Sequence, residues 1–548
     1  MTPKRPIMVL GASGVFGSRV CRHLLKGGAD VVAVARDPSR LEKLHRELGD
    51  LGPLQTVQGT LPDDLAPLLI AHRPSAVIDT AGPFQGRTYR VPRACIDHGV
   101  TYFDLSDGRE DVAGITALDD AAKNARVTIL SGVSTVCAVS SAVIEHLKPA
   151  FSVIDTIEVA IVPGNDAPRG PAVTSSVLSW VGKPVPRWSH GEQTIVTGWQ
   201  EIHRRTIGSL GKRWLANCDV PDAVLLGPRY DARHVRLHAG MELPIIHFGL
   251  WLLSWPVRWG LVRNLASVSG VLQPIANALR PFGTNTGGMV VSVTGTRTDG
   301  RPLHRLWTLE ASEGDGPMVP ASASAALALS ILRGGTLEPG ARPCLGEARL
   351  PDILDVLKPY AIRTTTNDER PVPLYRQALG EGFDCLPEPV RAIHDRVTSF
   401  RATGQVTITL GRNPIARCLQ ALGLLPRPGA GIETEVTFTM RDGRERWTRR
   451  FGSFSGSSVQ GWPSKDHVWE KIGPIAGQAR FKAHKAGLDL ELASFRFLGI
   501  PLPRFLWLRA WGHERADEEG RFTFDVGIAL PFGLDLVTYK GWLVEGSD

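Results

Sequence analysis

Gly11-Ala-Ser-Gly14-Val-Phe-Gly17 is the stretch that decides the fold of this 548-residue sequence. It follows the short apolar segment Ile7–Leu10, which has the length and composition of a buried strand. Behind it, apolar residues recur every four positions up to the pair Gly27-Gly28, at Phe16, Val20 and Leu24. This order predicts a strand, a tight turn and then a helix that ends at the glycine pair.

Each glycine of the turn has a physical reason to be there. Gly11 and Gly14 permit a tight turn and a close approach of the backbone to a ligand, and Gly17 lets the helix pack on the strand. The N-terminus of the helix presents unpaired N–H groups and a positive dipole end, which suit a pyrophosphate. The pattern therefore predicts a dinucleotide-binding turn; the alternative is an ordinary glycine turn.

The sequence around the turn alternates short apolar strands with helical patterns up to about residue 135. Such alternation is typical of a parallel α/β sheet, so we predict a Rossmann-type N-terminal domain over residues 1–145. The strands that we expect are Ile7–Leu10, Val31–Ala35, Ala76–Asp79, Thr101–Leu105 and Val127–Leu130.

The end of the second strand indicates which dinucleotide the domain prefers. Arg36 follows this strand and Arg40 lies one helical turn further, so both can pair with a ribose 2′-phosphate. Asp37 is one place past the position at which an acidic residue would accept a free 2′-hydroxyl. This favours NADP(H) over NAD(H); the alternative is that both arginines are solvated surface residues.

Ala81, Gly82 and Pro83 follow the strand at Ala76–Asp79, in the crevice where the nicotinamide end should lie.

The mechanism of the short-chain dehydrogenases, which needs Tyr-x-x-x-Lys, is excluded. The six tyrosines are followed four places on by other residues, namely Arg93, Ser106, His234, Thr364, Leu379 and Leu543.

Three segments resemble the saccharopine-dehydrogenase-like family. They are Ser75-Ala-Val-Ile-Asp-Thr-Ala-Gly-Pro-Phe84, Ala94-Cys-Ile-Asp-His-Gly-Val-Thr-Tyr-Phe-Asp-Leu105 and Val127-Thr-Ile-Leu-Ser-Gly132. In that family they correspond to strands four, five and six of the Rossmann domain. The resemblance is close over the first 145 residues and loose over residues 150–350.

The resemblance implies cofactor contacts at Ala12, Ser13, Gly14, Val15 and Phe16, at Arg36, and at Ala81, Gly82 and Pro83. It also places Ser106 and Asp107 near the nicotinamide. Family members often carry Gly-Phe-Asp or Gly-Leu-Asp after strand six, whereas this chain has Gly132-Val-Ser134. A carboxylate expected near the substrate is thus missing, and saccharopine is not the expected substrate.

Candidate acids near the end of the expected strand Thr101–Leu105 are Asp104, Asp107, Tyr102 and His98. Aspartate and histidine beside strand and helix ends are more often structural caps than catalysts. No catalytic residue is therefore assigned.

Beyond residue 146 the pattern predicts an α+β middle domain to residue 362, for substrate binding or dimerisation. Met289–Gly295 and Leu303–Glu310 suggest a hairpin around Asp299-Gly300, and Ala321–Leu332 suggests a helix. The polar segment Thr364–Pro373, with two prolines, is predicted to be a linker.

Residues 374–548 are predicted to form a β-rich domain. Its expected strands include Thr434–Met440 and Arg446–Phe451 around Arg441-Asp-Gly443, then Phe522–Ala529 and Leu534–Leu543. Leu386-Pro-Glu-Pro-Val-Arg-Ala-Ile-His394 and Thr538-Tyr-Lys-Gly-Trp542 resemble a bacterial domain of unknown function that often follows such proteins.

Composition restricts the partners and the compartment. The net charge of +7 is mild, and the basic run from Arg444 to Arg450 fits an exposed strand face better than a nucleic-acid site. Seven scattered cysteines form no Cys-x-x-Cys pair, so neither a disulfide framework nor a metal site is expected. The N-terminus shows no signal-peptide pattern, so we expect a cytoplasmic protein.

The uncharged segment Leu243–Val257 leaves three alternatives open: a transmembrane helix, packing inside the fold, or shallow contact with the inner face of a membrane. Trp251, Trp255 and Trp259, with Arg258, would anchor such a contact, although Pro256 should disturb the helix. If the segment is core instead, all three rings should be buried.

Three functions remain open. The first is an NADPH-dependent reductase of an apolar or lipid-like small molecule, because seven of the fourteen tryptophans lie between Trp180 and Trp259. These rings would equally suit a domain core or a homodimer seam. The second is a non-catalytic dinucleotide-binding or redox-sensing protein, and the third is a module that binds a hydrophobic ligand through the C-terminal domain.

Overall fold

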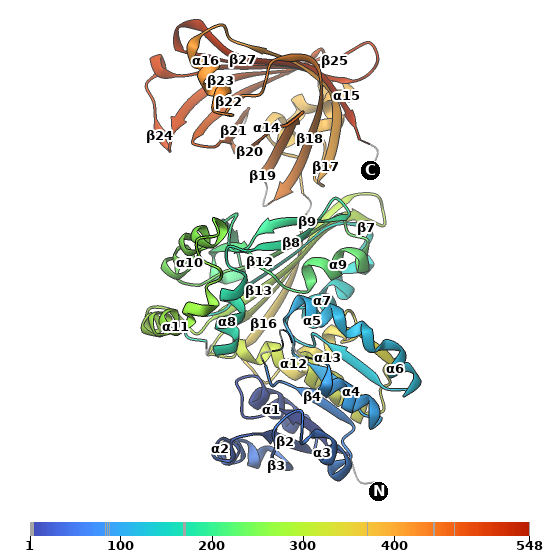
Figure 1. Cartoon of the computed structure of the whole chain (residues 1–548). Coiled ribbons are helices and arrows are strands. Elements are labelled where there is room, and N and C mark those ends of the chain that lie inside the picture. The colour runs from blue at the N-terminus through green and yellow to red at the C-terminus, as the bar shows by residue number, and fades with distance from the viewer. Residues whose placement is uncertain are drawn as a thin grey trace. The chain divides into compact units, whose positions relative to one another are not determined.

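The computed structural model describes residues 5–82, 84, 86, 88–167, 171–369, 371–441, 444–464 and 466–546. The chain forms two compact units, Met1–Glu369 and Arg370–Asp548 (Figure 1). Pro83 and the turn residues Asp442 and Gly443, named above, lie outside the described residues.

The first unit begins with a parallel sheet of seven strands among the described residues, in the order β15-β6-β5-β4-β1-β2-β3. The order of β1 to β6 is that of the dinucleotide-binding fold, so the predicted Rossmann-type domain is confirmed. The strands are β1 (Ile7–Leu10), β2 (Val31–Ala35), β3 (Leu54–Gln58), β4 (Ala76–Asp79), β5 (Thr101–Asp104), β6 (Thr128–Ser131) and β15 (Gly340–Pro343).

Helices cover both faces of this sheet. The helix after the glycine turn, α1, runs from Gly17 to Lys26 and buries Val20 and Leu24, and Gly27 ends it as predicted. The other helices are α2 (Pro38–Leu48), α3 (Leu65–His72), α4 (Arg90–Asp97), α5 (Arg109–Gly114), α6 (Asp119–Asn124) and α7 (Ala138–Leu147).

The predicted α+β middle domain is confirmed as a mixed sheet of nine strands in the described part of the unit. The predicted hairpin is β13 (Gly287–Arg297) with β14 (Pro302–Ala311), which pair along their whole length. The other strands are β7 (Phe151–Val162), β8 (Pro184–Ser189), β9 (Glu192–Thr197), β10 (His203–Thr206), β11 (Lys212–Asn217), β12 (His234–Ala239) and β16 (Ile362–Glu369).

The helices of this domain are α8 (Pro171–Trp180), α9 (Asp222–Tyr230), α10 (Pro244–Arg258), α11 (Ser269–Ala278), α12 (Val319–Leu332) and α13 (Leu350–Leu357). The helix predicted at Ala321–Leu332 is α12, and it packs on α1. Its Leu329 lies so close to Gly27 that a Cβ there would sit 2.5 Å from a leucine methyl. The two domains therefore share one continuous hydrophobic core.

The linker predicted from Thr364 was placed wrongly. Residues 362–369 form the edge strand β16, which pairs antiparallel with β14 from His304 to Ala311. Most of its side chains are exposed. An edge strand that faces solvent needs polar residues, and these gave the segment the composition of a linker.

The apolar segment Leu243–Val257 forms the helix α10. Pro256 lies inside it, so the helix is not interrupted where we expected a disturbance. One face of α10 is buried and the other is exposed, so the expectation that a core segment would bury all three tryptophans is not met: Trp259 is exposed. Among the described residues, no helix is long and apolar enough to cross a membrane.

The second unit is β-rich, as predicted. Its antiparallel sheet closes into a barrel, because β22 pairs with both β21 and β23. The strands are β17 (Phe400–Leu410), β18 (Gly429–Arg441), β19 (Arg444–Phe451), β20 (Phe454–Ser464), β21 (His467–Ile472), β22 (Ile475–His484), β23 (Gly487–Phe497), β24 (Ile500–Pro501), β25 (Arg509–Ala516), β26 (Phe522–Leu530) and β27 (Leu534–Glu545).

Three helices accompany the barrel: α14 (Leu374–Leu379), α15 (Glu388–His394) and α16 (Pro414–Ala421). The first two pack apolar side chains against inward-facing strand residues such as Phe400 and Phe438, and so form the core of this unit. The four strands that the sequence predicted here lie within β18, β19, β26 and β27.

Candidate functional site

The glycine turn joins β1 to α1 at the carboxyl edge of the first sheet. Gly11 has φ +71°, which glycine adopts without strain, and a Cβ on it would sit 2.9 Å from backbone atoms of Ala81. A Cβ on Gly17 would lie 2.3 Å from the Gly11 oxygen and 2.7 Å from Ala12 Cα. These two glycines are thus required by the fold itself.

Gly14 differs from the other two glycines. Within 4 Å, a Cβ built on it would meet one described atom, the Gly11 oxygen at 3.1 Å. The space beside Gly14 is open, as a ligand-facing glycine requires.

The N-termini of the first two helices also differ. Among the described residues, no side chain caps the first turn of α1, although the Ser18 and Arg19 N–H groups donate to the Gly14 and Phe16 carbonyls, each at 3.1 Å. The positive end of the helix dipole therefore has no side-chain carboxylate on it and suits an anion. At α2 the Asp37 carboxylate accepts hydrogen bonds from the Ser39 and Arg40 N–H groups, at 2.9 and 3.4 Å. The acidic residue near the end of β2 is therefore engaged as a helix cap.

Arg36 and Arg40 lie on the surface beside this cap. Both are exposed, and the Arg40 guanidinium lies 3.5 Å from Asp37. The Arg36 carbonyl accepts a hydrogen bond from the Gln58 side chain at 3.1 Å, which ties the end of β2 to β3. The arginine side chain stays at the surface, where a 2′-phosphate can reach it.

The segment after β4 packs against the glycine turn. The Thr80 hydroxyl donates to the Leu10 carbonyl at 2.7 Å, and the Ala81 N–H donates to Asp79 at 2.8 Å. Ala81 and Gly82 thus lie beside the turn. The structure brings the predicted residues 11–17, 81 and 82 to one edge of the sheet, and Arg36 and Arg40 to the tip of the neighbouring strand.

A buried carboxylate, Asp104, holds the loops after β5 and β6 together. One of its oxygens accepts hydrogen bonds from the Ser106 N–H (3.0 Å), the Ser131 hydroxyl (2.9 Å) and the Gly132 N–H (2.9 Å). Burial raises the pKa of Asp104 to about 6, although these donors act against the shift. This geometry is that of a structural residue.

The other candidate acids occupy different positions. Asp107 is exposed and accepts a hydrogen bond from Ser176 of α8 at 3.4 Å, so it faces the middle domain. The Tyr102 hydroxyl is buried and donates to Asp79 at 3.3 Å. His98 was placed wrongly: it ends α4 and precedes β5, so it lies at the opposite edge of the sheet.

The loop after β6 contains a residue that the sequence did not single out. Cys137 has φ 66° and ψ −68°, a strained conformation for a residue other than glycine. Its N–H donates to Asp222 of α9 at 2.6 Å, and Asp222 also accepts from the Ser140 hydroxyl. A carboxylate from the middle domain thus caps α7, near the place where the family carboxylate is missing.

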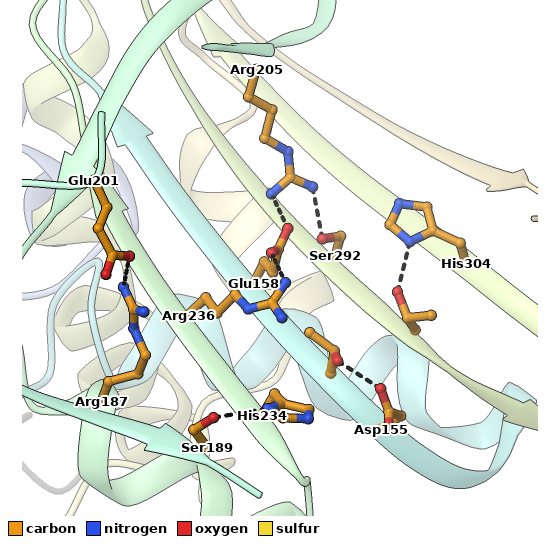
Figure 2. Close-up of polar contacts among 12 residues, drawn as sticks. Asp155, Glu158, Arg187, Ser189, Glu201, Arg205, His234, Arg236, Ser292 and His304 are labelled. Atoms are coloured by element: carbon orange, nitrogen blue, oxygen red, sulfur yellow. Dashed lines mark hydrogen bonds and ion pairs between the residues drawn. The ribbon is translucent and has the colours of Figure 1, made fainter. Parts of the chain in front are cut away.

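A second polar cluster lies on the middle sheet (Figure 2). Glu158 of β7 pairs with Arg205 of β10 at 2.8 Å and with Arg236 of β12 at 3.0 Å, and Arg205 also donates to Ser292 at 2.7 Å. All four side chains are buried. Charges at this depth are stable only when they are paired, and these are.

Near this cluster the Ser189 hydroxyl lies 3.2 Å from Nδ1 of His234. Burial lowers the pKa of His234 to about 2, so its ring is neutral. No sequence motif predicts this cluster, because its members come from strands far apart in the chain.

The fold and the glycine turn are those of the Rossmann class, whose members bind dinucleotides at this turn. Residues 7–130 match the family model of the saccharopine dehydrogenase NADP binding domain, and residues 386–543 match that of a domain of unknown function, DUF4166. Residues 7–130 and 386–543 are thus similar to these two families, and the predicted resemblance is confirmed.

Solved structures are similar at low identity. Saccharopine dehydrogenase (L-Glu forming) from Saccharomyces cerevisiae is 13% identical, with a TM-score of 0.47, over 67% of this chain and 100% of that one. A short-chain dehydrogenase from Sphingobium yanoikuyae in complex with NADPH is 19% identical, with a TM-score of 0.19, over 23% of this chain and 71% of that one. A search of curated proteins found no match.

Proposed function

We propose that this protein is an NADPH-dependent oxidoreductase that reduces an apolar or lipid-like small molecule. The observation that carries the proposal is the contrast between the two helix N-termini. Among the described residues no side chain caps the first turn of α1, beside the open space at Gly14, whereas Asp37 caps α2 and the neighbouring Arg36 is exposed. A pyrophosphate suits the uncapped N-terminus of α1, and a 2′-phosphate suits the exposed Arg36.

The same crevice supports a hydride transfer. In open α/β sheets the nicotinamide lies beyond the carboxyl ends of the strands, here at Ala81, Gly82 and the loops after β5 and β6. The buried Asp104 fixes these loops through hydrogen bonds. Hydride transfer depends mainly on the correct distance and orientation between cofactor and substrate, which fixed loops provide. Ser106 and Asp107 then lie on the nicotinamide side.

The neighbourhood of this crevice supports an apolar substrate. Helix α8 contacts Asp107 through Ser176, and its Leu178 is part of a hydrophobic cluster with Trp199, Leu250 and other side chains. A substrate beside Asp107 and α8 would meet the partly exposed side chains of Val177 and Trp180, which pack on this cluster.

Isotope transfer tests the proposal. The protein is incubated with NADPH deuterated at C4 and, in separate reactions, with long-chain enones, long-chain ketones and polar 2-oxo acids. We expect deuterium in the product of an apolar substrate, detected by mass spectrometry, and none in the oxo-acid products. Transfer to the oxo acids alone would contradict the proposed substrate class.

One observation favours a second candidate, a dinucleotide-binding protein without catalysis. The carboxylates Asp79 and Asp104 at the edge of the sheet both hold loops through hydrogen bonds. NADPH binding without deuterium transfer to any of these compounds would favour this alternative.

A further inference from the structure

One face of α10 carries a stripe of exposed apolar side chains. Ile245, Leu252 and Trp259 are 68%, 64% and 66% exposed, and they follow one another at intervals of seven residues. Positions seven apart lie on the same side of an α-helix.

The opposite face of α10 fixes the orientation of the helix. Leu250 and Val257 are buried there against Leu178, Trp199 and further apolar side chains of the same unit. Trp199 also donates its indole N–H to the His247 carbonyl at 2.9 Å. The stripe therefore points outward because the core holds the other side of the helix.

The exposed apolar area continues beyond α10. Leu261 follows the helix, Ile275 belongs to α11 and Phe282 follows α11, and each is more than half exposed. Helices α10 and α11 lie on the same side of the unit (Figure 1), and Leu272 of α11 packs on the cluster that holds α10. We call the six side chains the α10–α11 face: Ile245, Leu252, Trp259, Leu261, Ile275 and Phe282.

The segment that forms this face is basic in sequence, and Asp166 from another segment pairs with Arg280 at 2.8 Å. The sequence contains no Asp or Glu between Glu242 and Asp299, whereas four arginines lie in this interval, namely Arg258, Arg263, Arg280 and Arg297. Arg258 and Arg263 are exposed beside the stripe. Exposed arginines beside apolar side chains complement an anionic lipid surface.

Three indole rings form a row along the helix. Trp251 and Trp255 have centroids 5.9 Å apart, Trp255 and Trp259 are 5.5 Å apart, and the Arg258 guanidinium lies over Trp255 at 5.2 Å. Indole rings favour the boundary between lipid headgroups and acyl chains, and arginine favours lipid phosphates.

We propose that the α10–α11 face docks this protein on a bilayer that contains anionic phospholipid. The 15 residues of α10 are too few to span a bilayer, and its buried face is occupied by the protein core, so the helix lies in the plane of the headgroups. Leu252 and Trp259 enter the apolar boundary, while Arg258 and Arg263 contact phosphates. The proposal concerns a surface and does not rest on the proposed reaction.

Vesicle flotation with the full chain tests the docking. The wild type should float with vesicles of equal parts phosphatidylcholine and phosphatidylglycerol, should stay below with phosphatidylcholine alone, and should lose binding as salt is raised. The double variant Leu252→Glu/Trp259→Glu should lose at least about tenfold in partitioning, since burial of one such side chain alone changes an equilibrium by about that factor.

Matched controls separate docking from folding. Ile70→Glu and Ile195→Glu alter side chains that are 61% and 62% exposed elsewhere on the same unit, and they should leave flotation unchanged. Arg258→Gln/Arg263→Gln should lower partitioning by about tenfold while apolar contacts remain. All variants should keep the circular dichroism spectrum of the wild type.

Three results would overturn the proposal. The wild type would remain unbound to anionic vesicles, or the control variants would reduce flotation as strongly as the double variant. In the third, the wild type would sediment as a dimer that the double variant abolishes, without vesicle binding, and the face would then be a seam between two copies of this chain.

Discussion

At the scale of single residues, the atoms around each glycine of the turn determine whether a substitution there affects ligand binding or stability. Gly14→Val should abolish NADPH binding and leave the melting temperature close to that of the wild type, because the added side chain enters the space left for the pyrophosphate. Gly17→Ala should lower the free energy of unfolding by about 1–3 kcal/mol, since its Cβ collides with the Gly11 and Ala12 backbone.

Two measurements check this pair: NADPH fluorescence enhancement and thermal unfolding followed by circular dichroism. Binding by Gly14→Val with unchanged affinity would contradict the assignment of the turn as the pyrophosphate site.

Asp104 should make stability depend on pH. The folded state holds its proton up to about pH 6, whereas the unfolded chain releases it near the ordinary pKa of 3.8. The wild type should therefore lose roughly 2–3 kcal/mol of unfolding free energy relative to Asp104→Asn as the pH rises from about 4 to 7. Denaturant unfolding of both proteins at several pH values measures this difference, and a constant difference would refute it.

Some residue roles follow from the sequence and others depend on distant partners. Gly11 and Gly17 are predictable because strand, turn and helix are consecutive in the chain. The roles of Asp37 as a cap and of Asp222 at α7 are not, because the first depends on local geometry and the second on a contact across 85 residues.

At the scale of elements, the sequence predicts the central strands of the first sheet better than those of the second. The strands β1 and β2 are continuous apolar runs, β4 is apolar up to Asp79, and all three were predicted to the residue. The buried strands β7 and β12 were not predicted, because charged residues such as Glu158 and Arg236 interrupt their apolar pattern. The edge strands β3, β15 and β16 were missed because none of them shows a continuous apolar pattern. In β3 and β16 polar residues interrupt the pattern, and in β15 Gly340 and Pro343 do so.

The two faces of α10 should respond differently to the same truncation. Leu250 is 8% exposed and lies in the apolar cluster, so Leu250→Ala should cost about 2–5 kcal/mol of unfolding free energy. Leu252 lies two residues further on the outward face, and Leu252→Ala should change stability by no more than about 0.5 kcal/mol. Equal losses in thermal unfolding would show that the helix is oriented differently.

At the scale of the whole molecule, the division after Glu369 should be physically separable. The first unit has its own core, which includes β16, and the second has a closed sheet filled by α14 and α15. A chain that ends at Glu369 should fold and bind NADPH within about twofold of the full chain, because unit 1 contains the entire turn and both arginines. Calorimetric titration and circular dichroism of this fragment check the expectation, and an unfolded fragment would contradict it.

The most direct test of the account is the cofactor preference, measured by calorimetric titration with NADPH and NADH. If Arg36 faces the 2′-phosphate, NADPH should bind more tightly, and Arg36→Ala should remove about 1.5–3 kcal/mol of that preference, which is roughly ten- to hundredfold in affinity. Arg46→Ala, an exposed arginine further along α2, should leave it unchanged. Equal affinity of the wild type for NADPH and NADH would contradict the account.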